Sequence, residues 1–313
     1  MVKPIIAVLG ANPAWQKTFF FKEFVHGKVN RSLKNENYPA GKGVNFCRAA
    51  HCFGKADVLL FQFAGGINGE RLCRGLDETG INHRTISTAA ETRSCITCLE
   101  ENGQMTELIG TSVAITDSEA NKMLDILNQN MSDVKIFAVT GSLPDGSKKT
   151  LYRQAVQNAL TNNIPVLLDT LVDIDGILKL PGKIILKVNR EEFFKITGQD
   201  DIHQAHRYAA KNFPDKIFAI TNGADSATLS YGKKIAVYQL PEISVISPLG
   251  AGDTASAVMA SLLTDTNDYA AAFKMALAAA SANCLNAVAG EFSIEKACEI
   301  LDLIKMDIQD ITL

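Results

Sequence analysis

The chain has 313 residues, of which 47% are hydrophobic and 21% are charged, and its formal net charge is −3. A chain of this size and composition can bury a large core without disulfides or metal ions. It carries no block of like charge, so nothing in its composition calls for nucleic acid or a membrane as a partner. No stretch approaches the roughly 18 apolar residues of a membrane span, and the first apolar run is too short for a signal peptide, which predicts a cytoplasmic protein.

Short runs rich in Ile, Val and Leu alternate with helix-like stretches along the chain. The predicted strands cover residues 4–9, 57–63, 135–140, 164–169, 184–188 and 216–221. The predicted helices cover residues 44–53, 118–130, 148–160 and 201–212. Continuous apolar runs are typical of buried parallel strands, and their alternation with helices predicts a layered α/β fold. From Ala251 onward the chain reads as nearly all helix, with an Ala-rich stretch over residues 269–289.

Two segments interrupt this alternation. Residues 17–24 combine aromatic residues with Thr, and residues 93–109 contain two strand-like runs around Asn102-Gly103, which favours a tight hairpin turn. Strands inserted among βα units predict a small β lid that covers a site on the main sheet. No linker or repeat divides the chain, so we expect a single domain with this lid.

The cysteines and histidines give no strong signal for a metal or redox site. Seven scattered cysteines, several of them in apolar runs, are typical of reduced core thiols. Cys95 and Cys98 lie three residues apart in a strand-like run, where their side chains would point to opposite faces. His203 and His206 could share one helix face, but no third ligand is spaced near them, and we expect them to be solvated.

The sharpest motif is Pro248-Leu249-Gly250-Ala251-Gly252-Asp253-Thr254, which opens a helix-like run. Glycines there allow several backbone N–H groups to turn toward one point, and a helix N-terminus adds partial positive charge, so the motif predicts an anion site. Such a site would stabilise a phosphoryl group in transfer. Asp253 would stand beside it, suited to take a proton from an attacking hydroxyl. The alternative is an ordinary capped helix after a glycine turn.

A second motif, Gly41-Lys42-Gly43-Val44-Asn45, again places glycines just before a predicted helix. Lys42 and Asn45 are available there as a cation and a hydrogen-bond donor for a phosphate or a polyol. The chain contains no G-x-x-x-x-G-K-[ST] motif, and its first strand is not followed by G-x-G-x-x-G. These absences argue against a P-loop or a dinucleotide-binding protein.

The motifs and their order along nearly the whole chain resemble those of the PfkB family of carbohydrate kinases. Within this family the chain is most similar to the branch of 1-phosphofructokinase, tagatose-6-phosphate kinase and the minor 6-phosphofructokinase. Further matches are Asn12-Pro13-Ala14, Gly27 to Arg31, Glu91-Thr92-Arg93, Gly141 to Pro144, Lys187 with Asn189 to Glu192, and Thr221-Asn222-Gly223. The resemblance implies a ribokinase-like three-layer α/β/α sandwich over residues 1–313, with lid segments at about 13–38 and 92–111. It also implies ATP and Mg²⁺ as cofactors and a homodimer formed through the lid.

The resemblance assigns roles to individual residues. Catalysis would fall to Asp253 with the loop residues Gly250, Ala251 and Gly252. The substrate would be bound by Gln16, Lys28, Gly41, Lys42, Asn45, Arg93 and Ser142. The nucleotide would be bound by Lys187, Asn189, Thr221, Gly223, Gly250, Gly252 and Asn283, and the magnesium ion by Asn189 and Glu192.

The implied reaction transfers the γ-phosphoryl group of ATP to a hydroxyl of fructose 1-phosphate, fructose 6-phosphate or tagatose 6-phosphate. Three positions depart from the branch: Gln16 replaces an Asp that bonds sugar hydroxyls, Ala40 replaces a Gly, and Val188 stands where a Pro is usual. The identity of the sugar therefore stays open. The alternatives are a kinase of an unphosphorylated sugar or nucleoside, and a catalytically weak sugar-binding regulator of the same fold.

Overall fold

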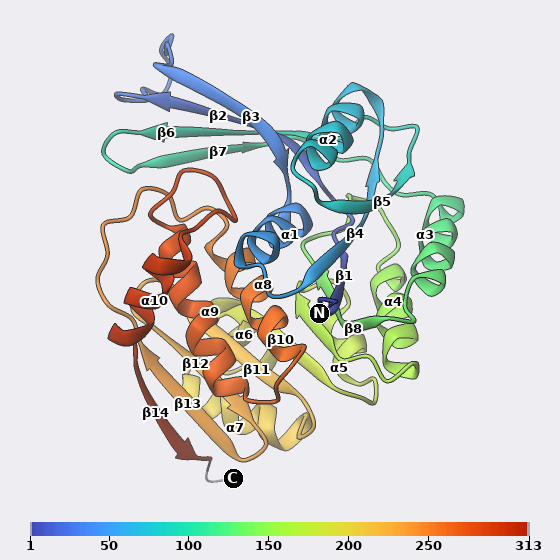
Figure 1. Cartoon of the computed structure of the whole chain (residues 1–313), viewed down its shortest axis with the longest axis vertical. Helices are drawn as coiled ribbons and strands as arrows, with labels where there is room; N and C mark the ends of the chain where they lie inside the picture. Colours follow the sequence, from blue (N-terminus) through green and yellow to red (C-terminus); the bar gives the residue numbers. More distant parts are fainter. Residues whose placement is uncertain (1, 312–313) are drawn as a thin grey trace.

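The computed structural model describes residues 2–311. They form a ten-stranded main sheet, which lies between two layers of helices, and a separate four-stranded sheet (Figure 1). The strand order of the main sheet is β14-β13-β12-β11-β10-β9-β8-β1-β4-β5. Its strands are β1 (Ile5–Leu9), β4 (Asp57–Ala64), β5 (Asn82–Ser87), β8 (Val134–Thr140), β9 (Val166–Asp169), β10 (Ile184–Asn189), β11 (Ile217–Asn222), β12 (Ser226–Tyr231), β13 (Lys234–Gln239) and β14 (Lys305–Asp310). The predicted α/β sandwich with a β lid is confirmed.

The six predicted strands are the parallel centre of this sheet. β1 pairs with β4 and β8, and β8, β9, β10 and β11 follow one another, each parallel to its neighbour. Successive residues serve opposite faces: Ile6 and Val8 pack into one core, and Ala7 and Leu9 into the other. Because both faces are covered, these strands are apolar throughout, which is why their sequences could be recognised.

Two layers of helices cover the two faces of the main sheet. One layer contains α1 (Lys42–Phe53), α2 (Gly66–Glu78), α8 (Ala251–Leu263), α9 (Tyr269–Asn283) and α10 (Ile294–Leu303). The other contains α3 (Asp117–Gln129), α4 (Thr150–Thr161), α5 (Ile174–Leu178), α6 (Arg190–Thr197) and α7 (Ile202–Asn212). Among residues 2–311, no helix is both long enough and apolar enough to cross a membrane.

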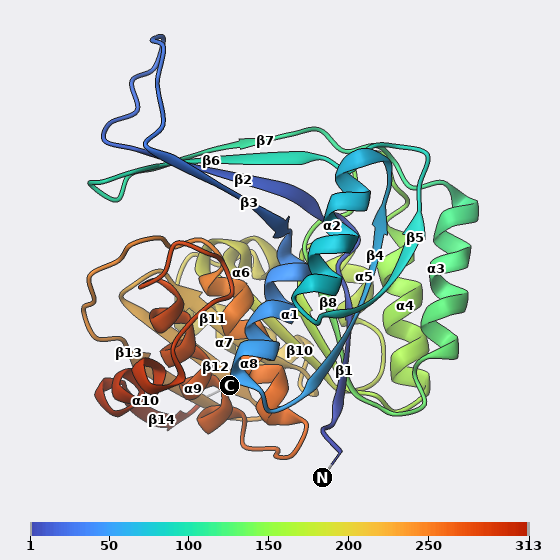
Figure 2. The ribbon, with the colours of Figure 1, turned by 45° about the horizontal axis from the view of Figure 1, so that its top comes forward.

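The lid is a four-stranded sheet in the order β3-β2-β6-β7, and it lies over one end of the main body (Figure 2). Its strands are β2 (Ala14–Phe21), β3 (Lys34–Ala40), β6 (Ser94–Glu100) and β7 (Met105–Ile109). The predicted hairpin around Asn102-Gly103 is confirmed, since β6 and β7 pair antiparallel across it. β3 was not predicted because its polar sequence, KNENYPA, has no strand-like apolar pattern.

Three sequence-based expectations need correction. The C-terminal part is not all helix, because β14 adds an exposed edge strand to the sheet. The Ala-rich helix ends at Asn283 rather than continuing to residue 289. His206 is buried rather than solvated, with its ring nitrogens 2.8 Å and 2.7 Å from the hydroxyls of Ser230 and Thr228. All seven cysteines are free thiols, as predicted.

Candidate active site

Polar side chains gather where three neighbouring parallel strands end. Thr140 is the last residue of β8, Asp169 is the last residue of β9, and Thr140 is paired with Asp169 across the two strands. Lys187 lies near the end of β10, the next strand along the sheet. In open parallel sheets, ligands bind in the crevice outside the carboxyl ends of the strands. The fold therefore directs these groups toward a single site.

Two cavities open at this edge of the sheet. The strand-end cavity has a volume of about 500 Å³, and its polar lining includes Asn12, Thr140, Ser142, Lys149, Asp169 and Glu192. The lid cavity has a volume of about 390 Å³, and its lining includes Gln16, Tyr38, Asn45, Cys95, Gly250 and Asp253. Lys42 and Arg93 line both cavities. The two spaces are thus neighbouring parts of one candidate active site under the lid.

Asp253 lies in the first turn of α8, at the wall of the lid cavity. Gly250 caps this helix with φ +79°, in the left-handed region that favours glycine. A Cβ on Gly250 would lie 2.5 Å from the Cβ of Ala289, so only glycine fits. The first turn that follows contains Ala251, Gly252 and Asp253, whose N–H groups have no preceding helical carbonyl to bond, and helix ends of this kind favour anions.

The carboxyl group of Asp253 is nearly enclosed, with 7% of the residue exposed. Asn45 of α1 donates its Nδ2 to Asp253 Oδ2 over 2.8 Å. Burial, reinforced by the negative charge of Asp169, raises the pKa of Asp253 to about 6. A carboxylate with such a pKa is ionised at neutral pH and is a stronger base than an exposed one.

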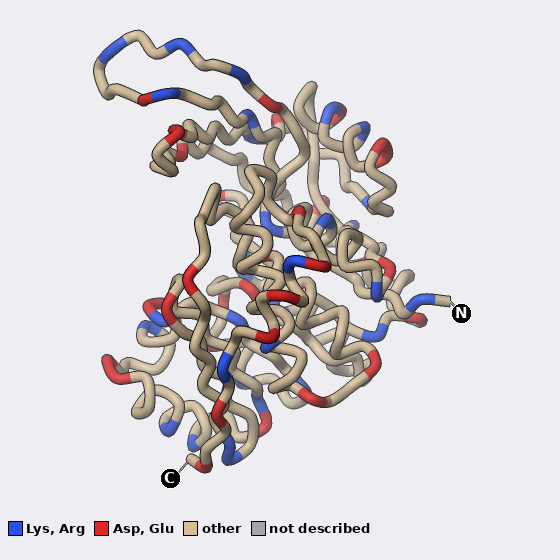
Figure 3. The backbone as a smooth tube through the Cα atoms, turned by 60° about the vertical axis from the view of Figure 1, so that its left-hand side comes forward, with Lys and Arg blue, Asp and Glu red and all other residues tan. Residues whose placement is uncertain are grey.

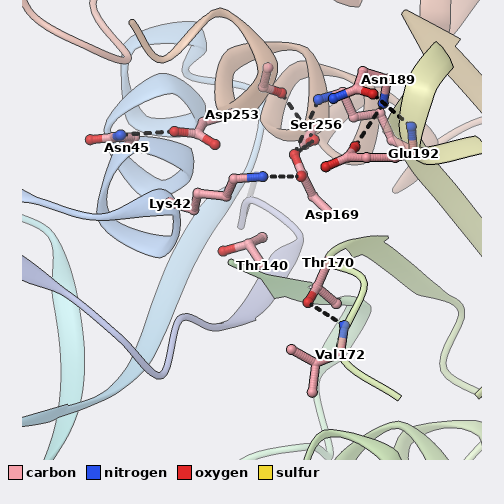
Figure 4. Close-up of polar contacts among 12 residues, drawn as sticks. Lys42, Asn45, Thr140, Asp169, Thr170, Val172, Asn189, Glu192, Asp253 and Ser256 are labelled. Atoms are coloured by element: carbon pink, nitrogen blue, oxygen red, sulfur yellow. Dashed lines mark hydrogen bonds and ion pairs between the residues drawn. The ribbon is translucent and has the colours of Figure 1, made fainter. Parts of the chain in front are cut away.

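Asp169 is the centre of a buried charge cluster, and sequence reasoning did not identify it (Figure 4). Its Oδ1 accepts from Lys42 Nζ over 2.7 Å, and its Oδ2 accepts from Lys187 Nζ over 3.2 Å and from Ser256 Oγ over 2.7 Å. Burial by itself would raise the pKa of Asp169, but the charges of Lys187 and Lys42 hold it below its usual range. The available signal was a single Asp at the carboxyl end of a predicted buried strand, the place where parallel sheets present polar groups.

Arg93 and its neighbours form the cationic side of the strand-end cavity. Arg93 Nη2 donates to the backbone oxygen of Asn12 over 3.0 Å, and Asn12 Nδ2 donates to Ser142 Oγ over 3.2 Å. Two buried polar atoms here, Arg93 Nε and Thr140 Oγ1, have no hydrogen-bond partner within residues 2–311. Buried polar groups are normally paired, so these two donors suit a bound polar ligand. Lys149 adds an exposed cation to the same wall.

Most of the predicted substrate-binding residues come together in the structure. Gln16 lies on the inner face of the lid, where its Nε2 donates to Thr97 Oγ1 over 2.8 Å. Lys28 is the exception, because it is exposed on the segment 22–33 between β2 and β3 and lines neither cavity. We call this segment the arm, and it projects from the lid, away from the body (Figure 3). The predicted residues that line one or both cavities are Gln16, Gly41, Lys42, Asn45, Arg93 and Ser142.

The predicted nucleotide and metal residues are more dispersed. Lys187 is buried, and its Nζ lies 2.8 Å from the position that a Cβ of Gly252 would take, so it sits beneath the glycine loop. Thr221 and Gly223, at the end of β11, line neither cavity. Asn283 was predicted to contact the nucleotide, but it is fully buried. Its Nδ2 donates to the Leu249 oxygen, and its Oδ1 accepts from Thr254 and the Gly290 N–H, so it supports the loop from below.

Asn189 and Glu192 form a capping box that begins α6. Asn189 Oδ1 accepts from the Glu192 N–H, and Glu192 Oε2 accepts from the Asn189 N–H, both over 2.9 Å. Glu192 also lines the strand-end cavity. Magnesium is usually held by one or two carboxylates together with substrate phosphates. Within the described residues no group of three metal-ligating side chains occurs, and the single carboxylate of Glu192 fits an ion held mainly by a nucleotide.

Comparisons with known proteins agree with this geometry. The model of the pfkB family of carbohydrate kinases matches residues 14–297. Phosphofructokinase-2 from Escherichia coli in complex with fructose-6-phosphate is similar in structure, with a TM-score of 0.85 and 20% identity over 97% of this chain and 99% of that chain. The tetrameric inhibited form of the same enzyme has a TM-score of 0.85 and 21% identity over the same shares. A protein from Thermotoga maritima, titled a possible 1-phosphofructokinase, has a TM-score of 0.87 and 18% identity over 98% of this chain and all of that chain.

At these identities the structural likeness establishes the fold alone, whereas the family match spans most of the chain. The glycine-capped helix bearing Asp253 and the lid over the strand ends lie within the matched residues. This chain belongs to the pfkB family and is a carbohydrate kinase, with ATP as the phosphate donor that this family implies.

Proposed function

We propose that this kinase transfers the γ-phosphoryl group of ATP to a hydroxyl of a sugar phosphate of the fructose 1-phosphate, fructose 6-phosphate or tagatose 6-phosphate class, with Asp253 as the general base. The observation that carries the proposal is the position of Asp253. Its buried carboxylate lies beside a glycine-capped helix N-terminus and faces a cavity roofed by the lid. A base and an anion site side by side are what transfer to a hydroxyl requires.

In the proposed reaction, the attacking hydroxyl of the sugar occupies the lid cavity and gives its proton to Asp253. Asn45 orients the carboxylate by its hydrogen bond to Oδ2. The first-turn N–H groups of α8 and the buried Nζ of Lys187 would stabilise charge on the phosphoryl group. The lid would exclude water, which would otherwise hydrolyse ATP. Magnesium, with Glu192 as its protein ligand, would neutralise charge on the nucleotide phosphates.

The cationic side of the strand-end cavity supports a phosphorylated substrate. Arg93 spans both cavities, so it could bind a phosphate while the sugar hydroxyl stays near Asp253. Arg is suited to this because its planar guanidinium forms several charge-assisted hydrogen bonds with one phosphate. Lys149 and Ser142 line the same wall. A kinase of unphosphorylated sugars would need cations here only for the phosphates of the nucleotide.

We further propose that two copies of the chain assemble through the lid. The arm exposes Val29 by 82% and Leu33 by 65%, and such exposed apolar side chains on a projecting segment favour contact with another protein. In a dimer of this kind, Lys28 would face the partner rather than the cavities of its own protomer.

The test is ADP release from Mg-ATP with a panel of fructose 1-phosphate, fructose 6-phosphate, tagatose 6-phosphate, ribose and nucleosides. One phosphosugar should be turned over, and D253N should lower its kcat by about 100- to 10,000-fold. Turnover of ribose or a nucleoside alone would refute the phosphosugar assignment. Full activity of D253N would refute the role of Asp253.

A further inference from the structure

The carboxylates of Asp169 and Asp253 occupy one buried cluster but have very different partners. Asp169 accepts hydrogen bonds from two lysines and one serine, and only 3% of the residue is exposed. Asp253 accepts one side-chain hydrogen bond, from the neutral amide of Asn45, as far as residues 2–311 show. Both lysines of the cluster are thus bonded to Asp169, whereas Asp253 faces the lid cavity.

Distance alone does not explain why both lysines bond to Asp169 rather than to Asp253. The charges of Lys42 and Lys187 both act on Asp253, so the two cations are within electrostatic reach of it. The charged groups that face Asp253 come from every side of the cavity. The carboxylate of Asp253 is within electrostatic reach of Lys42 and Arg48 of α1, Asp169 of β9 and Lys187 of β10. The same cavity is lined by Arg93, just before β6, and by Glu107 of β7.

We propose that Asp169 is a positioning residue that bonds Lys42 and Lys187 and so keeps both cations from pairing with Asp253. The inference rests on the proposed role of Asp253 as the base. A carboxylate paired with a lysine binds a proton less readily, so a direct pair with Lys42 or Lys187 would weaken the base. By accepting both ammonium groups itself, Asp169 leaves Asp253 with a neutral partner while the cations remain beside the path of the phosphoryl group.

Ser256 belongs to the same arrangement. It lies one turn after Asp253 in α8, and its hydroxyl donates to Asp169 Oδ2 over 2.7 Å. The helix that presents the base therefore also fixes the acid that holds the lysines. Ser261, further along α8, is equally buried, and among the described residues its hydroxyl bonds only to the oxygen of Ala257 within its own helix, so it provides a matched control.

The main experiment is the pH dependence of kcat/KM for Mg-ATP and the panel sugar phosphate with the highest turnover, in wild type, D169N, S256A, S261A and D253N. D169N removes the negative charge beside Asp253 and frees the lysines to pair with it, so the acid limb should move about 1–3 pH units lower as kcat falls. S256A should shift the acid limb in the same direction by a smaller amount, and S261A should leave the acid limb at the wild-type pH. Adding K42M to D169N should move the limb back toward the wild-type pH.

This set of variants distinguishes a failure of the inference about Asp169 from a failure of the proposed function of Asp253. If D253N is inactive but the acid limb of D169N stays at the wild-type pH, Asp169 has only a structural role and the inference is wrong. If D253N retains activity, the proposed function fails instead. Should D169N not fold, equal profiles for S256A and S261A would overturn the inference.

A second measurement needs no substrate. Burial of the Asp253 carboxylate opposes its ionisation, so D253N should raise the melting temperature of the otherwise wild-type protein at pH 8. In the D169N background Asp253 would hold the freed lysines, and D253N should then lower the melting temperature, because it leaves those cations unpaired. If D253N raised the melting temperature by the same amount in the wild-type and D169N backgrounds, the inference would be contradicted.

Discussion

At the scale of single residues, the site depends on two aspartates placed in opposite electrostatic surroundings. Burial and Asp169 raise the pKa of Asp253 to about 6, whereas Lys187 and Lys42 overcome burial and lower the pKa of Asp169. Pairs of acids whose surroundings separate their pKa values are typical of catalytic sites. Neither value could be inferred from the identity of the residue alone.

The raised pKa of Asp253 gives a direct prediction for the wild-type enzyme. As the proposed base, Asp253 must be ionised to accept a proton, and its folded-state pKa lies above that of an exposed Asp. We therefore expect kcat/KM to be constant at neutral pH and to fall about tenfold per pH unit below about 6. A steady-state profile between pH 4.5 and 8 with buffers of constant ionic strength measures this, and an acid limb near pH 4 would contradict it.

Arg93 gives a second residue-scale prediction. Removing its charge should weaken binding of the sugar phosphate by the value of a charged hydrogen bond, about 1.5–3 kcal/mol, so R93Q should raise KM about 10- to 100-fold. The exposed Arg74 of α2 provides a control of the same type, and R74Q should leave KM unchanged. An unchanged KM in R93Q would exclude Arg93 as a phosphate contact.

At the scale of elements, the site depends on where α8 begins. Gly250 adopts φ +79°, and its Cα packs so closely on Ala289 that a Cβ would lie 2.5 Å from the Ala289 Cβ. This contact fixes the first turn of α8, and with it Asp253, against the loop between α9 and α10. Asn283 at the end of α9 holds the same loop by its bond to the Gly290 N–H.

Alanine substitutions at Gly250 and Gly232 distinguish the two effects of an added Cβ, which are backbone strain and overpacking. Gly232 also has a positive φ, of +59°, but a Cβ there would have no neighbour within 4 Å. G232A should lower the free energy of unfolding by about 1 kcal/mol through backbone strain alone. G250A should lower it by a further 1–3 kcal/mol, roughly, through overpacking, and should also reduce kcat. Urea unfolding of both variants measures the difference, and equal losses would contradict the packing argument.

At the scale of the whole molecule, the lid covers the candidate active site, whereas the arm projects away from the body. The body covers its apolar strands on both faces, but the arm leaves Val29 and Leu33 largely exposed. We therefore expect the protein to sediment at twice its chain mass of 33.8 kDa. Analytical ultracentrifugation of V29D/L33D should show the monomer. L303D, at an apolar residue on α10 that is 61% exposed, should remain dimeric, and a wild-type monomer would refute the proposed assembly.

The sequence by itself determined the layered fold and the lid hairpin, and it located the helix-opening glycine loop that carries the proposed base, Asp253. The parallel strands could be recognised because burial on both faces demands an apolar run, and Gly250 to Asp253 because a helix-opening glycine loop has a local signature. Only the tertiary structure decided that Asp169 and Ser256 join Lys42 and Lys187, since these side chains come from elements far apart in the chain. It also decided that Asn283 is buried, that Lys28 lies outside the cavities and that β14 completes the sheet. Side-chain partners and edge strands depend on packing between distant segments, which local sequence patterns do not encode.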